Sequence, residues 1–221
     1  MPSRFEAILF DMDGTLVESE NIWQIAETEM FAARGIDYTD EVRQLIIGTR
    51  LDEMFQRLKN VFHLPESIEE LSDELVARMV ALIPTEVKPK PGASEMIAYA
   101  AENGLHYCIA SSSPLSIIDA VVAAQGWQSL IPHRYSADAV PLGKPAPDIY
   151  LYAAQQLGVD PAACLALEDS PNGARAAVAA GMTCYAVPDY HSVPAAFADV
   201  TPHVFSSLHD VHALLLKDHY A

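Results

Sequence analysis

The hydrophobic and polar positions of the chain predict a sheet made of short buried strands. Apolar runs of strand length occur at 7–10, 105–110, 134–137, 164–167 and 183–187, with a shorter run near 203–205. From residue 92 onward these runs alternate with stretches of helical periodicity, at 92–103, 114–125, 148–157, 172–180 and 207–216. Such alternation is typical of parallel βαβ units with helices on both faces of one sheet. We therefore predict an α/β fold with a Rossmann-like parallel sheet.

The segment that follows the first strand has a different pattern. Apolar residues at 22, 25, 26, 30 and 33 have helical spacing over 21–34, and further helical stretches follow at 40–47, 51–60 and 66–83. A proline-rich run at 84–92 then forms a stiff connector. We predict that residues 18–90 form an all-helical cap domain inserted into an α/β core of residues 1–17 and 91–221. The hinges of this cap are expected near 16–20 and 84–92.

Composition and charge limit the classes of function. A hydrophobic fraction of 51% and a charged fraction of 19% are ordinary for a soluble globular protein. The net charge of −17 argues against binding to nucleic acid or to an anionic membrane. Cys108, Cys164 and Cys184 lie singly in apolar runs, which favours buried free thiols in a reducing compartment. We expect a cytoplasmic protein and a monomer, although the acidic surface is compatible with a specific dimer.

Polar residues follow three of the predicted strands. Asp11 and Asp13 follow the first strand, Ser111 follows the second, and Glu168 and Asp169 follow the strand at 164–167. The carboxyl ends of parallel strands meet at one edge of a sheet, so we expect these side chains to lie together. Like charges held close together favour a bound cation, and Mg²⁺ prefers carboxylate oxygens. Each cluster taken alone could also be an ordinary polar turn or helix cap.

Two further segments suit a phosphoryl group. Ser111-Ser112-Ser113-Pro114 joins a strand end to a helix start, where free backbone N–H groups and the helix dipole favour an anion. We expect Ser113 to cap the helix while Ser111 and the N–H of Ser112 face the ligand. Lys144 lies between Gly143 and a proline and could neutralise the carboxylates and a phosphoryl group. A surface lysine is the alternative interpretation.

Together these residues resemble the motifs of the haloacid dehalogenase superfamily. Within it the chain is similar to the phosphatases with a helical cap after the first strand, in the subfamily of β-phosphoglucomutase and 2-deoxyglucose-6-phosphate phosphatase. The sequence DMDGT at 11–15 carries the first motif, Ser111 the second, Lys144 in GKPAPD the third, and Glu168-Asp169 in LEDSPNG the fourth. The resemblance covers essentially the whole chain.

The resemblance implies a phosphoaspartyl mechanism. Asp11 would be the nucleophile, and Asp13 would protonate the leaving alcohol and then activate water. The implied Mg²⁺ ligands are a carboxylate oxygen of Asp11, the backbone carbonyl of Asp13, Asp169 and an assisting Glu168. Ser111, the N–H of Ser112 and Lys144 would hold the phosphoryl oxygens. The expected substrate-binding residues of the core are Asp11, Gly14, Thr15, Ser111, Ser112, Ser113 and Lys144.

The cap carries two residues that bear on the substrate. Arg50 in IGTRLDE matches the position where mutase-like relatives bind the distal part of the substrate, or it is an exposed helix-start residue. Trp23 stands where the mutase has a histidine, and it either lines a sugar-stacking wall or packs inside the cap. We predict a Mg²⁺-dependent phosphatase acting on a small sugar or polyol phosphate. The alternatives are a sugar phosphomutase and a signalling protein that is phosphorylated on aspartate.

Overall fold

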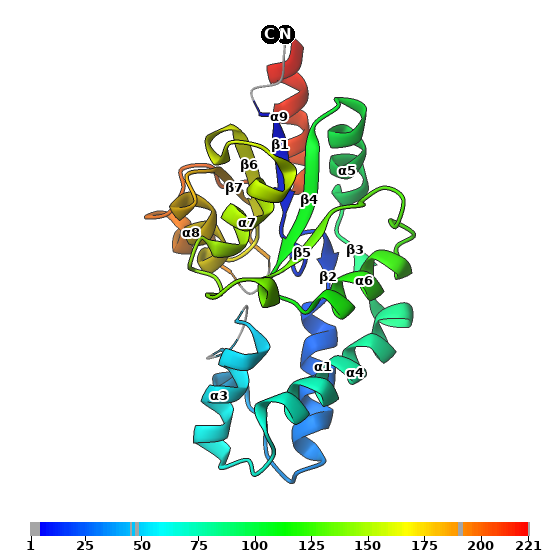
Figure 1. Ribbon diagram of the computed structural model, residues 1–221, viewed down its shortest axis with the longest axis vertical. Helices are drawn as coiled ribbons and strands as arrows, with labels where there is room; N and C mark the ends of the chain where they lie inside the picture. The colour runs from blue at the N-terminus through cyan, green and yellow to red at the C-terminus, as the bar shows by residue number, and fades with distance from the viewer. Residues whose placement is uncertain (1–4, 45, 47–48, 190–191, 221) are drawn as a thin grey trace.

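The computed structural model describes residues 5–44, 46, 49–189 and 192–220, and its main feature is a parallel sheet of five strands in the order β5-β4-β1-β6-β7 (Figure 1). The five strands are β1 (Ala7–Phe10), β4 (His106–Ser111), β5 (Arg134–Ser136), β6 (Cys164–Glu168) and β7 (Thr183–Ala186). The helices around this sheet are α5 (Ala93–Glu102), α6 (Leu115–Ala124), α7 (Asp148–Leu157), α8 (Pro171–Ala179) and α9 (Leu208–Tyr220). Four further helices follow the first strand, namely α1 (Glu20–Ala32), α2 (Asp40–Gln44), α3 (Leu51–Phe62) and α4 (Ile68–Glu86).

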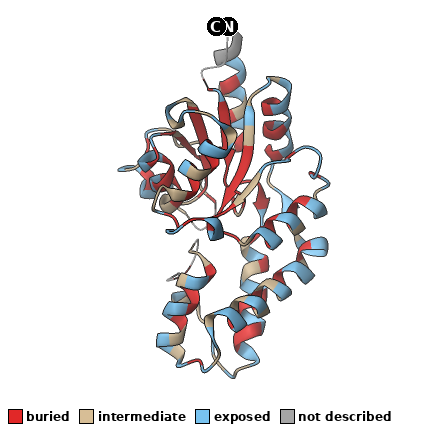
Figure 2. Ribbon diagram, in the orientation of Figure 1, coloured by how far each residue is buried: buried red, intermediate tan, exposed pale blue. Residues whose placement is uncertain are grey.

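Alternation along β1 explains why helices cover both faces of the sheet. Ile8 and Phe10 point into an apolar cluster that includes α5, α6 and α9. Ala7 and Leu9 point to the opposite face, into a second cluster with α7 and α8. The central strands β1 and β6 are accordingly buried along their whole length (Figure 2). The predicted α/β fold with a parallel sheet and helices on both faces is confirmed.

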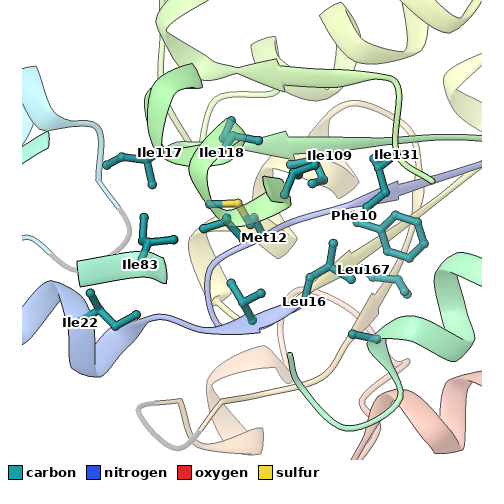
Figure 3. Packing of buried hydrophobic residues seen from close by; sticks show 14 of the residues in the cluster. Phe10, Met12, Leu16, Ile22, Ile83, Ile109, Ile117, Ile118, Ile131 and Leu167 are labelled. Carbon is teal, nitrogen blue, oxygen red and sulfur yellow. The ribbon is translucent and has the colours of Figure 1, made fainter. Parts of the chain in front are cut away.

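Helices α1 to α4 lie beyond the carboxyl ends of the strands (Figure 1). The two chain segments that lead to and from this helical part pair as a short antiparallel ribbon, β2 (Val17–Glu18) with β3 (Lys88–Pro89). Apolar packing continues without a break from the sheet into these helices, through Met12, Ile118, Ile22 and Ile83 (Figure 3). The helical part is therefore held against the core by a shared apolar cluster on the side of α1 and α4.

Several local predictions need correction. Helix α4 continues past Pro84 to Glu86, because a proline in the last turn removes a single backbone donor while Val87 N–H still bonds the Ile83 carbonyl. The short strand expected near 203–205 is a lone bridge between Ala186 and Val204. The helix expected over 40–47 is seen as α2, whereas residues 45, 47 and 48 lie outside the described residues. In the part of the chain that the structure covers, no helix has the length and apolarity to cross a bilayer.

Candidate active site

The predicted polar clusters meet at one edge of the sheet. Asp11 directly follows β1, Ser111 is the last residue of β4, and Glu168 is the last residue of β6. Strand β1 lies between β4 and β6, and the strand order changes direction at β1. Strands β4 and β5 lie on one side of it, and β6 and β7 lie on the other. Ligands of open α/β sheets bind at such a point, outside the carboxyl ends of the strands.

Lys144 joins two of these strand ends. Its ammonium nitrogen lies 2.6 Å from Asp11 Oδ1 and 2.7 Å from Glu168 Oε1, and all three side chains are buried. Glu168 Oε1 also accepts a hydrogen bond of 2.5 Å from the Tyr150 hydroxyl. Burial raises the pKa of Asp11 to about 7 although the Lys144 charge opposes that rise. Burial alone lowers the pKa of Lys144, but Asp11 and Glu168 raise it above its ordinary value, so this ammonium stays charged.

Asp11, Glu168 and Asp169 offer oxygen atoms that all lie within 4.8 Å of one another. Burial first, and then the charges of Asp11 and Glu168, raise the pKa of Asp169 well above its usual range. Backbone lies close to these carboxylates, since a Cβ on Gly14 would be 2.2 Å from Asp169 Oδ2 and one on Gly173 would be 2.0 Å from the Glu168 oxygens. Three buried carboxylates facing a single ammonium are short of positive charge, and their oxygens fit a hard divalent cation.

The carboxylate of Asp13 has entirely different surroundings. Its Oδ1 accepts hydrogen bonds from Ser19 Oγ at 2.6 Å and Trp23 Nε1 at 3.1 Å. Its Oδ2 accepts from Ser113 Oγ at 2.7 Å and Ser111 Oγ at 3.3 Å. Four donors therefore hold this side chain, which is outside the group of three carboxylates found among the described residues.

The expected capping role of Ser113 is wrong. Helix α6 starts after Pro114, and Pro114 at the N-cap position offers no side-chain hydrogen bond. Ser113 lies one residue before the N-cap position, and its hydroxyl donates a charge-assisted hydrogen bond to Asp13 instead. Ser112 lines the cavity, and its Oγ is buried without a hydrogen-bond partner among the described residues.

A cavity separates the strand ends from the helical cap. Its walls include the core residues Asp11, Asp13, Ser111, Ser112, Ser113, Pro114, Lys144, Asp169 and Ser170. The cap contributes Glu20, Trp23, Glu27, Arg43, Ile46, Thr49, Leu51 and Met54. Trp23 thus lines the cavity while its indole N–H is bonded to Asp13. Gly14 and Thr15 directly follow the lining residue Asp13 in the sequence, but they are not among the residues that line the cavity.

Arg50 contacts the loop that follows β5 and is not in the cavity. Its guanidinium donates to the carbonyls of Val140 at 2.8 Å and Ala137 at 3.2 Å, and it pairs with Asp52 at 2.7 Å. Arg50 is absent from the cavity walls formed by the described residues. The cap therefore touches the core on a second side, through a polar contact, and a role of Arg50 in substrate binding stays a prediction.

Sequence reasoning missed several residues of this site. Tyr150 and Ser19 looked like ordinary members of helical segments, yet both donate to active-site carboxylates. Glu20 and Glu27 also line the cavity, and their spacing of seven residues on one helix puts them on one face. This spacing, next to the apolar positions of α1, was the sequence signal that could have pointed to Glu20 and Glu27.

Comparison with known proteins assigns the family. The sequence model of the haloacid dehalogenase-like hydrolases matches residues 5–181. The chain belongs to this family. The predicted family and the prediction of a hydrolase are both confirmed.

Relatives of this haloacid dehalogenase-like hydrolase include named phosphatases. It is 36% identical to hexitol phosphatase B of Escherichia coli over 192 residues, and the aligned region covers 85% of each chain. It is 35% identical over 203 residues to protein CbbY of Cereibacter sphaeroides, covering 87% of this chain and 88% of the relative. The crystal structure of CbbY from Rhodobacter sphaeroides in complex with phosphate superimposes with a TM-score of 0.85 at 33% identity, covering 94% and 96% of the two chains.

Proposed function

We propose that this hydrolase is a Mg²⁺-dependent phosphatase that cleaves a small sugar or polyol phosphate through an aspartyl phosphate on Asp11. The observation that carries the proposal is the difference between the two aspartates of the first motif. Asp11 lies against Lys144 and the carboxylate cluster, whereas Asp13 is held by four neutral donors. Covalent phosphoryl transfer needs a nucleophile close to positive charge, and it needs an acid/base group close to that nucleophile.

The reaction proceeds in two displacements. A carboxylate oxygen of Asp11 attacks phosphorus, the bond from phosphorus to the ester oxygen breaks, and the protonated Asp13 gives its proton to the leaving alkoxide. The Asp13 carboxylate then takes a proton from water, whose oxygen attacks phosphorus. The bond from phosphorus to Asp11 breaks, which releases inorganic phosphate and leaves Asp13 protonated for the next turnover.

The remaining residues stabilise the charge that builds up on phosphorus. Asp11, Glu168, Asp169 and the backbone carbonyl of Asp13 would hold the Mg²⁺, which when bound offsets the negative charge of the phosphoryl group. Lys144 brings a fixed positive charge to Asp11 itself. The N–H of Ser112, the unpartnered Ser112 hydroxyl and the N–H groups at the start of α6 would donate to the phosphoryl oxygens. The hydroxyl of Ser111, whose proton goes to Asp13 in this structure, would turn to the phosphoryl group when substrate binds.

The substrate class is inferred from the relatives together with the cavity. The alignment with hexitol phosphatase B covers most of both proteins, which supports a phosphorylated polyol or sugar as the substrate here. The cap closes over the strand ends and contributes half of the cavity walls. Such closure excludes water from the nucleophile until the alcohol has left.

The direct test is phosphate release from a panel of sugar, polyol and nucleotide monophosphates, measured with Mg²⁺ and with excess chelator. We expect Mg²⁺-dependent release from a few sugar or polyol phosphates. Asp11→Asn should abolish it because an amide is not a nucleophile toward phosphorus, while thermal unfolding stays cooperative.

The matched control is Asp119→Asn, which changes an exposed aspartate that pairs with Arg134 on the core surface. This variant should keep the wild-type rate. Full activity of Asp11→Asn would refute the assignment of Asp11 as the nucleophile. A bisphosphorylated sugar formed in place of inorganic phosphate would identify a mutase, and a stable phosphoprotein without turnover would identify a signalling protein.

A further inference from the structure

The cap side of the cavity carries three buried charged side chains that the catalytic steps do not use. Glu20 and Glu27 both lie on α1, and Arg43 lies on α2. Arg43 Nη2 donates to Glu20 Oε2 at 2.8 Å, and Arg43 Nε lies 3.4 Å from Glu27 Oε2. Their side chains are only 13%, 7% and 6% exposed, in the order Glu20, Glu27 and Arg43. We call these three residues the cap charge cluster.

The cap charge cluster is costly if its purpose is only to join α1 to α2. Buried ion pairs are often no more stabilising than apolar residues of the same volume, since both ions lose their hydration. Burial raises the pKa of Glu20 to about 6 and that of Glu27 to about 7, although Arg43 opposes both shifts. The neighbouring guanidinium therefore does not compensate for the burial of the two carboxylates.

One atom of the cluster also lacks a partner. Arg43 Nε is buried and makes no hydrogen bond to any described residue, although it lies 3.4 Å from Glu27 Oε2. The Arg43 side chain is itself 6% exposed and lines the cavity. A buried N–H without a hydrogen bond costs free energy, so the three residues do not satisfy one another's hydrogen bonds.

The cluster offers a particular combination of donors and acceptors. Carboxylates only accept hydrogen bonds, and a guanidinium only donates them. A hydroxyl group does both, so one substrate hydroxyl can donate to Glu20 or Glu27 and accept from Arg43. A phosphate or carboxylate group can only accept here, and two carboxylates against one guanidinium would repel it.

The cap also contributes apolar residues to the cavity. Ile46, Leu51 and Met54 line the same cavity and are buried apolar residues. A polyol or sugar presents hydroxyl groups on one side and C–H groups on the other. The cap thus offers both polar and apolar contacts to such a molecule.

We propose that Glu20, Glu27 and Arg43 read the uncharged hydroxylated chain of a monophosphate and reject substrates that carry a second anionic group. The inference rests on the proposed phosphatase and adds the substrate class. It separates this chain from a relative such as CbbY of Rhodobacter sphaeroides, whose Asp-to-Asn variant was crystallised with xylulose-1,5-bisphosphate.

The test is the specificity constant kcat/KM of the full-length protein with Mg²⁺ on four compounds. These are glucitol 6-phosphate, fructose 6-phosphate, fructose 1,6-bisphosphate and 4-nitrophenyl phosphate. Glu20→Gln and Glu27→Gln keep the shape of each side chain and remove its charge. Glu29→Gln is the matched control, because Glu29 lies on the same helix, is 59% exposed and is outside the cavity walls.

We expect the wild type to prefer each monophosphate of a hydroxylated chain over the bisphosphate. In Glu20→Gln and Glu27→Gln the ratio of kcat/KM for glucitol 6-phosphate to that for 4-nitrophenyl phosphate should fall about ten- to a hundredfold, the usual effect of losing a hydrogen bond to a charged group. The preference for fructose 6-phosphate over the bisphosphate should narrow in the same variants. Glu29→Gln should leave all ratios at the wild-type values.

A wild-type preference for the bisphosphate would overturn the inference and leave the phosphatase standing. An equal loss on all four compounds in both variants would also overturn it, because that pattern reports a role in cap structure alone. Phosphate release from none of the compounds would overturn the phosphatase, and the inference with it.

Discussion

The burial of Glu27 predicts that its neutral isostere makes the protein more stable at alkaline pH. Glu27 is 5% exposed, and its polar side-chain partners among the described residues are the Tyr38 hydroxyl at 3.1 Å and Arg43 Nε at 3.4 Å. Burial is the largest cause of its raised pKa, which moves from 4.5 to about 7. Glu27→Gln keeps the hydrogen bond from Tyr38 and removes the ionised carboxylate.

The sign follows from proton linkage. A carboxylate whose pKa is raised by folding binds a proton more tightly in the folded than in the unfolded state. The stability linked to that proton is fully present below pH 4.5 and is lost as the pH rises through about 7. At about 1.4 kcal/mol per pKa unit, the loss reaches about 3 kcal/mol at pH 8. In a chain of 221 residues this corresponds to roughly 6–12 °C in Tm.

The assay is urea or thermal unfolding of the wild type, Glu27→Gln and Glu29→Gln from pH 5 to pH 8. We expect the two glutamine variants to match the wild type within error at pH 5. At pH 8 only Glu27→Gln should gain stability. A Glu27→Gln protein less stable than the wild type at pH 8 would refute the reasoning, because the ion pair with Arg43 would then outweigh the cost of burial.

Three further variants test other contacts. Gly14→Ala places a methyl group 2.2 Å from Asp169 Oδ2 at a backbone φ of +79°, so the Mg²⁺ concentration needed for half-maximal activity should rise at least tenfold, and an unchanged Mg²⁺ titration would contradict this. Trp23→Phe removes the indole donor to Asp13, so kcat should fall about tenfold with a well-folded cap, whereas an unchanged kcat would show that this hydrogen bond plays no part in turnover. Arg50→Ala removes the guanidinium from the core carbonyls, so solution scattering should show a larger radius of gyration than in Arg50→Lys, and identical curves would exclude Arg50 as a contact that closes the cap.

The strand ends could be predicted from the sequence because local rules determine them. Asp11, Ser111 and Glu168 follow apolar runs, and parallel topology alone then brings the ends of such runs to one edge. Lys144 was harder, since the sequence separates it from Asp11 by 133 residues and the contact depends on the path of a loop. Its flanking glycine and proline were the only local clue.

The cap could not be predicted to the same depth. The periodicity of α1 indicated a helix and its buried stripe, but not which face of it would meet the cavity. Arg43 comes from a different helix, so its pairing with Glu20 depends on the packing of α2 against α1. Ser113 was assigned to a cap because local rules favour that role, whereas the tertiary contact with Asp13 prevails.

The most direct test of the account is to trap the phosphoryl group on the enzyme. Asp13→Ala should form the aspartyl phosphate from acetyl phosphate, whose leaving group needs no proton, and should hydrolyse it slowly. After acid quenching, borohydride reduces an aspartyl phosphate to homoserine, which peptide mass spectrometry can locate. We predict homoserine at position 11, formed only when Mg²⁺ is present. Homoserine at another position, or none from a variant whose wild-type parent releases phosphate, would contradict the account.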